Sequence, residues 1–296
     1  METKTTQATD SSRYGNLTII PASDALGAEI RGVDLANVDN DTYRLIRNAL
    51  IDNLVVLIRD QNISDAELVA FSQLFGDLDL APPQENGQQA VNGLPEIMVI
   101  SNVKENGVPI GSLGDGEAIW HTDMNYVDVP PIGSALYSLE IPDHGGNTGF
   151  CNMYMALDAL PADLRAKLEG LSIKHDSSMT SGGFLRAGMD EVIDVSKCPG
   201  AIHPIIRTHP ESSREVLYLG RRLNAYIMGM SVDESEALLD EIWQHTTREE
   251  HTWHHQWQVG DVVFWDNRTV MHRRDSFDAG QRRVMHRTQI GDRPAA

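Results

Sequence analysis

The sequence predicts a protein of the α+β class, with an antiparallel β-sandwich or barrel at its core and helices at its periphery. Short apolar runs separated by Gly, Pro, Asn and Asp recur along its 296 residues and are typical of strands. Only a few stretches carry helical signals. Neither an internal repeat nor a domain boundary is visible. We therefore expect one domain over residues 15–296, preceded by a polar, mobile tail over residues 1–14.

The expected strands are short apolar runs bounded by turn-forming residues. In chain order they lie at residues 17–22, 27–35, 54–60, 97–101, 133–141, 216–220, 251–257, 261–266 and 283–290. Helical spacing or capping signals mark the expected helices. These lie at residues 39–53, 64–76, 153–171 and 231–246. Ser64 with Glu67, and Ser231 with Glu234, match the capping box, and Pro161 breaks the third helix.

Two long stretches, residues 80–95 and 176–200, carry no clear signal for a helix or a strand. Loops of this length inside a compact domain are usually functional lids or disordered segments. Both stretches are therefore candidates to cover an active site. The sequence does not decide whether either of them closes over a ligand.

The overall charge argues against two classes of partner. Asp and Glu total 43 against 24 Lys and Arg, a formal charge of −19, which repels nucleic acid and anionic membrane surfaces. No signal peptide, membrane span or CxxC motif is visible, and Cys151 and Cys198 lie far apart. We expect a soluble, cytoplasmic protein with two reduced thiols. A cluster of arginines can still bind an anionic small molecule in such a protein.

A candidate metal site begins in the stretch WHTDMNY, where His121 and Asp123 lie two positions apart. On a strand, residues at this spacing point to the same face and can reach one ion. Such a pair alone is a weak signal, because a half-exposed strand often carries two polar groups. His272, which we place at the end of the apolar strand DVVFW, supplies a third ligand. Two histidines and one carboxylate form the ligand set of non-haem Fe(II) oxygenases.

Four motifs carry a resemblance that extends from about Leu17 to Pro294: WHTD, GGNTGF at residues 145–150, WDNRTVMH and QRRVMHR. With them the chain resembles the taurine dioxygenase and 2,4-D dioxygenase family of Fe(II)/2-oxoglutarate-dependent oxygenases. The resemblance implies a double-stranded β-helix (jelly-roll) core with peripheral helices and long active-site loops. It also implies Fe(II), 2-oxoglutarate and O2 as cofactor and cosubstrates, and a homo-oligomer, either a dimer or a tetramer.

The resemblance also implies roles for individual residues. The metal ligands and catalytic centre would be His121, Asp123 and His272, the far carboxylate of 2-oxoglutarate would bind Arg283 and Thr148, and an anionic substrate would meet Arg287. Residue chemistry agrees, because a planar guanidinium matches a carboxylate with two parallel hydrogen bonds. Arg283 and Arg287 are four positions apart and share a strand face, whereas Arg282 points away.

The substrate is less well defined than the cofactor. Asp123 favours hydroxylation over halogenation, because related halogenases lack this carboxylate. Ala81 and Gln84 stand where the taurine enzyme has a histidine and a tyrosine, which disfavours taurine. Glu117, placed opposite Arg287, would suit a zwitterion. We therefore expect hydroxylation of an unactivated C–H bond in a small anionic or zwitterionic molecule, with release of succinate and CO2.

Two other classes use the same His/Asp/His set. Zinc binds this trio together with a water, as in a zinc-dependent hydrolase, and a non-catalytic metal-binding barrel could retain it as well. A hydrolase would have no evident use for Arg283 and Thr148. Arg221 and Arg222, in the stretch YLGRRLNAY, could line the pocket, but a solvated pair is the favoured interpretation.

Overall fold

The computed structural model describes residues 14–82 and 89–291. The expected tail lies almost entirely outside the described residues, and so does Gln84. Tyr14, which we assigned to the tail, differs from that expectation because it is buried and its hydroxyl donates a hydrogen bond to Asp52 at 2.7 Å. The folded chain therefore includes Tyr14.

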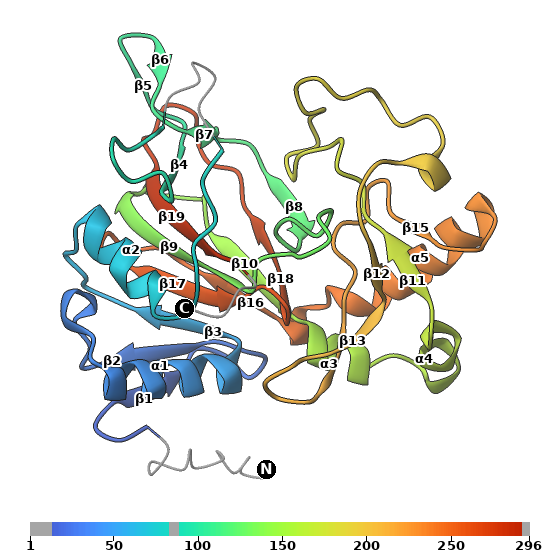
Figure 1. Ribbon diagram of the computed structural model, residues 1–296, viewed down its shortest axis with the longest axis horizontal. Helices are drawn as coiled ribbons and strands as arrows, with labels where there is room; N and C mark the ends of the chain where they lie inside the picture. The colour runs from blue at the N-terminus through green and yellow to red at the C-terminus, as the bar shows by residue number, and fades with distance from the viewer. Residues whose placement is uncertain (1–13, 83–88, 292–296) are drawn as a thin grey trace.

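Two β-sheets form the jelly-roll core of the molecule (Figure 1). The larger sheet contains, in spatial order, β1 (Thr18–Pro21), β2 (Ala28–Arg31), β3 (Val55–Ile58), β17 (Val262–Asp266), β9 (Gly133–Glu140), β19 (Val284–Ile290), β4 (Met98–Ser101) and β7 (Ser112–Leu113). The smaller sheet contains β16 (Thr252–His255), β10 (Thr148–Asn152), β18 (Val270–Arg274) and β8 (Ala118–His121). Apart from β2 with β3 and β4 with β7, the pairings in both sheets are antiparallel. The predicted double-stranded β-helix is confirmed.

Helices and small sheets flank this core. α1 (Asn40–Asn53) and α2 (Asp65–Gln73) pack against the larger sheet, and α3 (Met153–Asp158), α4 (Ala162–Leu168) and α5 (Val232–Thr246) lie at the opposite end of the molecule (Figure 1). The small sheets are β12–β11–β15, with bounds Ile202–Pro204, Ser172–Lys174 and Tyr226–Ile227, β13 (Ile206–Thr208) with β14 (Glu215–Leu217), and β5 (Lys104–Glu105) with β6 (Val108–Pro109). Among the described residues, no helix is both long and apolar enough to cross a membrane.

The continuous apolar run in β17 reflects burial on both of its faces. Val263 and Trp265 join the core between the sheets, whereas Val262 and Phe264 join a second apolar cluster beneath α1 and α2. Successive side chains of a strand point to opposite faces, so a strand covered on both sides must be apolar throughout. This strand therefore separates the cavity side of the large sheet from its helix-covered side.

Local signals explain where several elements begin and end. Both predicted capping boxes are present, at Ser64 with Glu67 and at Ser231 with Glu234. The helical stretch that follows β10 divides at Pro161 into α3 and α4, as predicted. The strand expected over residues 27–35 was too long, because β2 ends at Arg31. The next residue, Gly32, has a φ of 86°, which is outside the range of a β-strand.

Candidate metal centre and cosubstrate pocket

A cavity of about 640 Å³ opens between the two sheets and contains every predicted site residue. Its apolar wall comes mainly from the larger sheet, with Met98, Ile100, Leu136 and Trp265. Both long loops contribute to its lining, the first through Leu80 and Pro82 and the second through residues between Thr180 and Arg186. The described parts of both stretches therefore border the cavity, and whether they close over a ligand stays a prediction.

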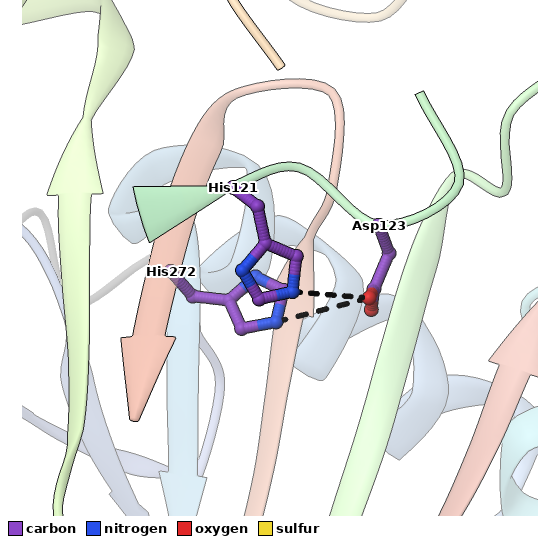
Figure 2. Close-up of side chains that lie close together, drawn as sticks. All are labelled: His121, Asp123 and His272. Carbon is purple, nitrogen blue, oxygen red and sulfur yellow. Dashed lines mark ion pairs between the residues drawn. The ribbon is translucent and has the colours of Figure 1, made fainter. Parts of the chain in front are cut away.

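The three predicted ligands meet at one end of this cavity. His121 on β8 and His272 on β18 are direct cross-strand partners, and their ring centroids are 4.2 Å apart. Oδ1 of Asp123 lies 3.6 Å from Nε2 of His121 and 3.9 Å from Nε2 of His272. Figure 2 shows the three side chains pointing toward one another. All three ligand atoms lie within 4.8 Å of one another, which fits a single metal ion bound by two imidazoles and one carboxylate.

The backbone around these ligands differs from the sequence expectation in two respects. β8 ends at His121, so Asp123 lies in the following turn, where Met124 has a φ of 47°. His272 lies on β18, a separate strand after the turn that follows β17. The assumption of a single regular strand was wrong for Asp123, because the turn swings its carboxylate toward the two rings.

Asn267 holds this turn in place and was missed by the sequence reasoning. Its Oδ1 accepts from the Asp123 amide at 2.9 Å, and its Nδ2 donates to the Asp123 carbonyl at 3.0 Å. Ser134 on β9 adds a hydrogen bond to Oδ2 of Asp123 at 3.3 Å. Asn267 stands within the motif WDNRTVMH, directly after β17, and its position in that motif was the available signal.

The protonation states suit metal binding. Nδ1 of His121 lies 2.7 Å from the Ile119 carbonyl, which can only accept, so Nδ1 carries the proton and Nε2 is free to bind a metal. Burial and the neighbouring His121 lower the pKa of His272 to about 3. Burial opposes ionisation of Asp123, but the charge of Arg287 holds its pKa well below its usual range. Neutral imidazoles and an ionised carboxylate are the forms that bind metals.

Arg283 carries a buried charge that none of the described residues compensates. Its side chain is almost fully buried, yet its guanidinium forms no hydrogen bond or ion pair with the described residues, and its Nε is buried without a partner. Burial and the nearby Arg274 lower its pKa to about 9. A buried cation without a partner is costly, and a carboxylate would compensate it with two hydrogen bonds. The site therefore fits the far carboxylate of 2-oxoglutarate.

Two other residues shape this end of the cavity. Thr148, at the start of β10, is buried, and its Oγ1 accepts a hydrogen bond from the Trp257 indole at 3.1 Å. Its hydroxyl proton is therefore free to be donated to a ligand. A Cβ at Gly146 would stand 3.2 Å from Nε of Arg283, so glycine in the GGNTGF motif leaves room for the guanidinium.

Arg287 and Glu117 both line the cavity, but each of them pairs with a different residue. Nη1 of Arg287 lies 3.2 Å and 3.3 Å from the two carboxylate oxygens of Asp123, and its Nη2 lies 3.2 Å from the sulfur of Met98. Glu117 is half-exposed and lies 3.3 Å from Nη2 of Arg273, a residue that sequence reasoning did not single out. Arg287 is thus at the metal end of the cavity, and Glu117 is at its rim.

The expectation for Arg221 was wrong. Its side chain is buried and lines the cavity, whereas Arg222 points to α5 and pairs with Glu236 and Asp240, each at 2.6 Å. The two arginines are adjacent in sequence, so local pattern could not separate them. Their different environments come from segments that are distant in sequence.

Comparisons with known proteins agree with this geometry. Residues 18–289 match the family described as taurine catabolism dioxygenase TauD, TfdA family. An (S)-phenoxypropionate/alpha-ketoglutarate-dioxygenase of Sphingobium herbicidovorans is 30% identical, over 94% of this chain and 96% of that protein. The alpha-ketoglutarate-dependent 2,4-dichlorophenoxyacetate dioxygenase of Cupriavidus pinatubonensis is 32% identical, over 92% and 96%. An alkylsulfatase of Acinetobacter baylyi is 32% identical, over 90% and 82%.

Solved structures show the same fold. A taurine dioxygenase from Burkholderia xenovorans superposes with a TM-score of 0.75 at 33% identity, covering 93% of this chain and 89% of that chain. The structure of AAD-2 in complex with Mn(II) and N-oxalylglycine superposes with a TM-score of 0.75 at 28% identity, covering 95% and 99%. The similarity thus extends over nearly the whole chain, including every strand that carries a site residue.

Proposed function

Because the chain belongs to the taurine catabolism dioxygenase TauD, TfdA family and is a 2-oxoglutarate-dependent dioxygenase, we propose that its metal is Fe(II), held by His121, Asp123 and His272. We further propose that it hydroxylates an unactivated C–H bond of a small anionic molecule. In the balanced reaction, one oxygen atom of O2 enters the substrate as a hydroxyl group. The other enters the succinate that forms, with CO2, from 2-oxoglutarate.

One observation carries this proposal above its alternatives: the buried, uncompensated Arg283 lies in the same cavity as the His/Asp/His cluster. Arg283 and Thr148 would hold the far carboxylate of 2-oxoglutarate, and the metal would take the oxo-acid end. Neither a zinc hydrolase nor a non-catalytic metal-binding barrel would account for a buried, uncompensated cation at Arg283. We therefore do not favour either alternative.

The chain's own contribution is to hold and to shield the reactants. When bound, iron and 2-oxoglutarate supply the oxidising chemistry. His121 and His272 are fixed as cross-strand partners, and Asn267 fixes the turn that presents Asp123. Leu136 and Trp265 are buried apolar residues of the cavity lining and would limit the access of water to the reacting centre. These residues set where a substrate C–H bond must lie.

The substrate class follows from the lining of the cavity together with the relatives' names. Phenoxypropionate, 2,4-dichlorophenoxyacetate and alkyl sulfates, which those names specify, each join an apolar body to one anionic group. The cavity offers the same combination of apolar side chains and arginines. We propose a substrate of this amphiphilic kind. Measuring succinate release with a series of such anions would identify it.

The decisive test is anaerobic addition of Fe(II) and then 2-oxoglutarate to the purified protein. We expect a visible metal-to-ligand charge-transfer band, because a bidentate oxo acid on Fe(II) produces one. His272→Ala should abolish the band by removing a ligand. His245→Ala serves as the matched control, since His245 lies on α5 outside the cavity and contacts Arg248. Absence of the band in the wild type, or its persistence in His272→Ala, would refute the proposal.

A further inference from the structure

Two further arginines, Arg186 and Arg221, line the cavity where a loop segment that the proposed function does not yet use meets the chain after β14. This segment, residues 176–188, is called the flap here; it belongs to the yellow loop that lies beside β8 in Figure 1. Arg186 belongs to the flap, and Arg221, from the chain after β14, reaches it. Both side chains line the cavity together with Tyr126.

The flap is a defined structure and is attached to the metal-binding strand. Met179 forms a β-bridge with Leu185, and the Thr180 amide donates to the Phe184 carbonyl at 2.8 Å. The Ile119 amide of β8 donates to the Ser181 carbonyl at 3.0 Å. Ile119 is two residues before the ligand His121, so the flap has a fixed position relative to the metal centre.

The two arginines converge on a single backbone oxygen. Nη1 of Arg221 donates to the Met179 carbonyl at 2.7 Å, and Nε of Arg186 donates to the same oxygen at 3.2 Å. Nη2 of Arg221 donates to the Asp176 carbonyl at 2.7 Å. Arg221 is buried and so loses the solvation that usually offsets a charge. Two like charges are thereby held close together beside the cavity.

Protein carboxylates neutralise this pair only in part. The carboxylate of Asp176 lies near Arg221, but it accepts hydrogen bonds from Ser178 and Asn224. Arg186 forms no ion pair with any described residue, and its guanidinium lies 4.6 Å from the centre of the Tyr126 ring. Its two terminal nitrogens have no hydrogen-bond partner in the described part of the chain. They are free to bind an anion.

The other cavity arginines are already engaged. Arg273 pairs with Asp275 at 2.6 Å and with Glu117, and Arg287 lies against Asp123. Arg283 is assigned to 2-oxoglutarate, and its neighbour Arg274 donates to the carbonyls of Leu113 and Gly116. Arg186 is therefore the cavity arginine best placed to receive an anion from another ligand.

We propose that Arg186, supported by Arg221 and Tyr126, binds the anionic group of the primary substrate. This inference rests on the proposed function and deepens it, because it places the substrate's charge on the flap instead of on Arg287. The apolar body would then extend from the flap along Met124 and Leu113 toward the metal. The flap residue Arg186 would determine which amphiphilic anions are accepted.

The test compares anionic probes with neutral counterparts of the same shape. The probes are 2,4-dichlorophenoxyacetate with its amide, and hexyl sulfate with hexanol, added anaerobically to protein loaded with Fe(II) and 2-oxoglutarate. Equilibrium dialysis at constant ionic strength gives each dissociation constant. In the wild type we expect at least one anion to bind about 10-fold or more tightly than its counterpart, as a charge-assisted hydrogen bond would provide.

Arg186→Gln should remove most of that preference, and Arg186→Lys should restore part of it. Arg222→Gln is the matched control, because Arg222 is paired with α5 outside the cavity and should leave the preference unchanged. An unchanged preference in Arg186→Gln, or no preference in the wild type, would overturn the inference. The charge-transfer band is recorded on the same samples and separates the two proposals. Absence of the band refutes the assignment of Fe(II) and 2-oxoglutarate. If the band is present and the preference for anions is missing or unchanged, only the role proposed for Arg186 is refuted.

Discussion

At the scale of single residues, the site contains buried charges, one of which no described residue compensates. Asp123 is kept ionised by Arg287, whereas the buried guanidinium of Arg283 pairs with none of the described residues. A protein maintains such charges at a cost in stability, since a buried cation normally needs a partner. Their presence in one cavity therefore indicates ligands that complete them.

Arg283→Gln should weaken 2-oxoglutarate binding by about 2 to 5 kcal/mol, because a desolvated charge-assisted pair is lost. The affinity for Fe(II) should change little, since Arg283 does not contact the predicted metal ligands His121, Asp123 and His272. Arg282→Gln is the control; Arg282 is exposed and pairs with Glu140 at 2.6 Å. Anaerobic calorimetric titration of the metal-free protein with Fe(II), and of the metal-loaded protein with 2-oxoglutarate, measures the two affinities. Equal losses of metal and cosubstrate affinity, or an equal effect of Arg282→Gln, would contradict the assignment.

At the scale of elements, the end of β17 is joined to a distant loop by an ion-pair network in which Asp266 and His209 are buried and Glu211 is exposed. Oδ2 of Asp266 lies 2.6 Å from Arg268 and 3.0 Å from His209, and Arg268 also reaches Glu211 at 2.8 Å. His209, Glu211 and Asp266 also lie close enough together to hold a metal. Because these carboxylates already bind Arg268, we interpret the group as a structural link between the large sheet and the loop after β13.

Asp266→Asn should destabilise the protein by about 3 to 5 kcal/mol, because it leaves the largely buried Arg268 short of its main partner. Burial opposes ionisation of Asp266, but Arg268 and His209 lower its pKa in the fold below the usual 3.8. Because the folded-state pKa is lowered, the ionised Asp266 stabilises the fold fully at pH values above the usual pKa. This contribution is lost as the pH falls through the folded-state pKa. The difference in the free energy of unfolding between the wild type and Asp266→Asn should therefore decrease at acidic pH.

Urea unfolding followed by circular dichroism at neutral and acidic pH measures this difference. Glu215→Gln provides the control, since the exposed pair of Glu215 with Arg165 should contribute only about 0 to 1 kcal/mol. If both variants lost the same stability, the network would have no special role in joining these elements.

At the scale of the whole molecule, the local charge of the cavity opposes the charge of the chain. The protein has a formal charge of −19, yet its cavity is lined by Arg186, Arg221, Arg273, Arg274, Arg283 and Arg287. Long-range repulsion acts on every anion, whereas the arginines act at contact distance inside a poorly solvated space. Anionic ligands are therefore selected by the cavity and not by the surface.

The two thiols report on the stability of the whole fold. Burial raises the pKa of Cys151 to about 12 and that of Cys198 to about 11, from an ordinary value of 9. Neither should react with a thiol reagent at pH 8 until the protein unfolds, when both should react. Since the folded-state pKa values are raised, their contribution to stability is complete below about pH 9 and is lost as the pH rises toward 11 and 12.

Counting reactive thiols along a urea titration tests this expectation. The count should rise from zero to two together with the loss of circular dichroism, because both side chains are almost fully buried. Rapid reaction of either thiol in native protein would show that the segment around it opens locally. The free energy of unfolding, measured by urea at several alkaline pH values, should decrease as the thiolates of the unfolded chain form.

The sequence by itself determined the features that depend on local pattern: the capping boxes, the break at Pro161 and the apolar strands. It also predicted that His121, Asp123 and His272 form a metal site, and the fold brings these three side chains together. It did not determine which charged groups would meet. Asp123 and Asn267 are 144 positions apart, and Arg287 and Asp123 are 164 apart. Periodicity reports only on neighbours within an element, so the turn that presents Asp123 and the burial of Arg221 beside Arg186 were decided by long-range packing. Only the tertiary structure brings these remote segments together, and with them the charged groups that line the cavity.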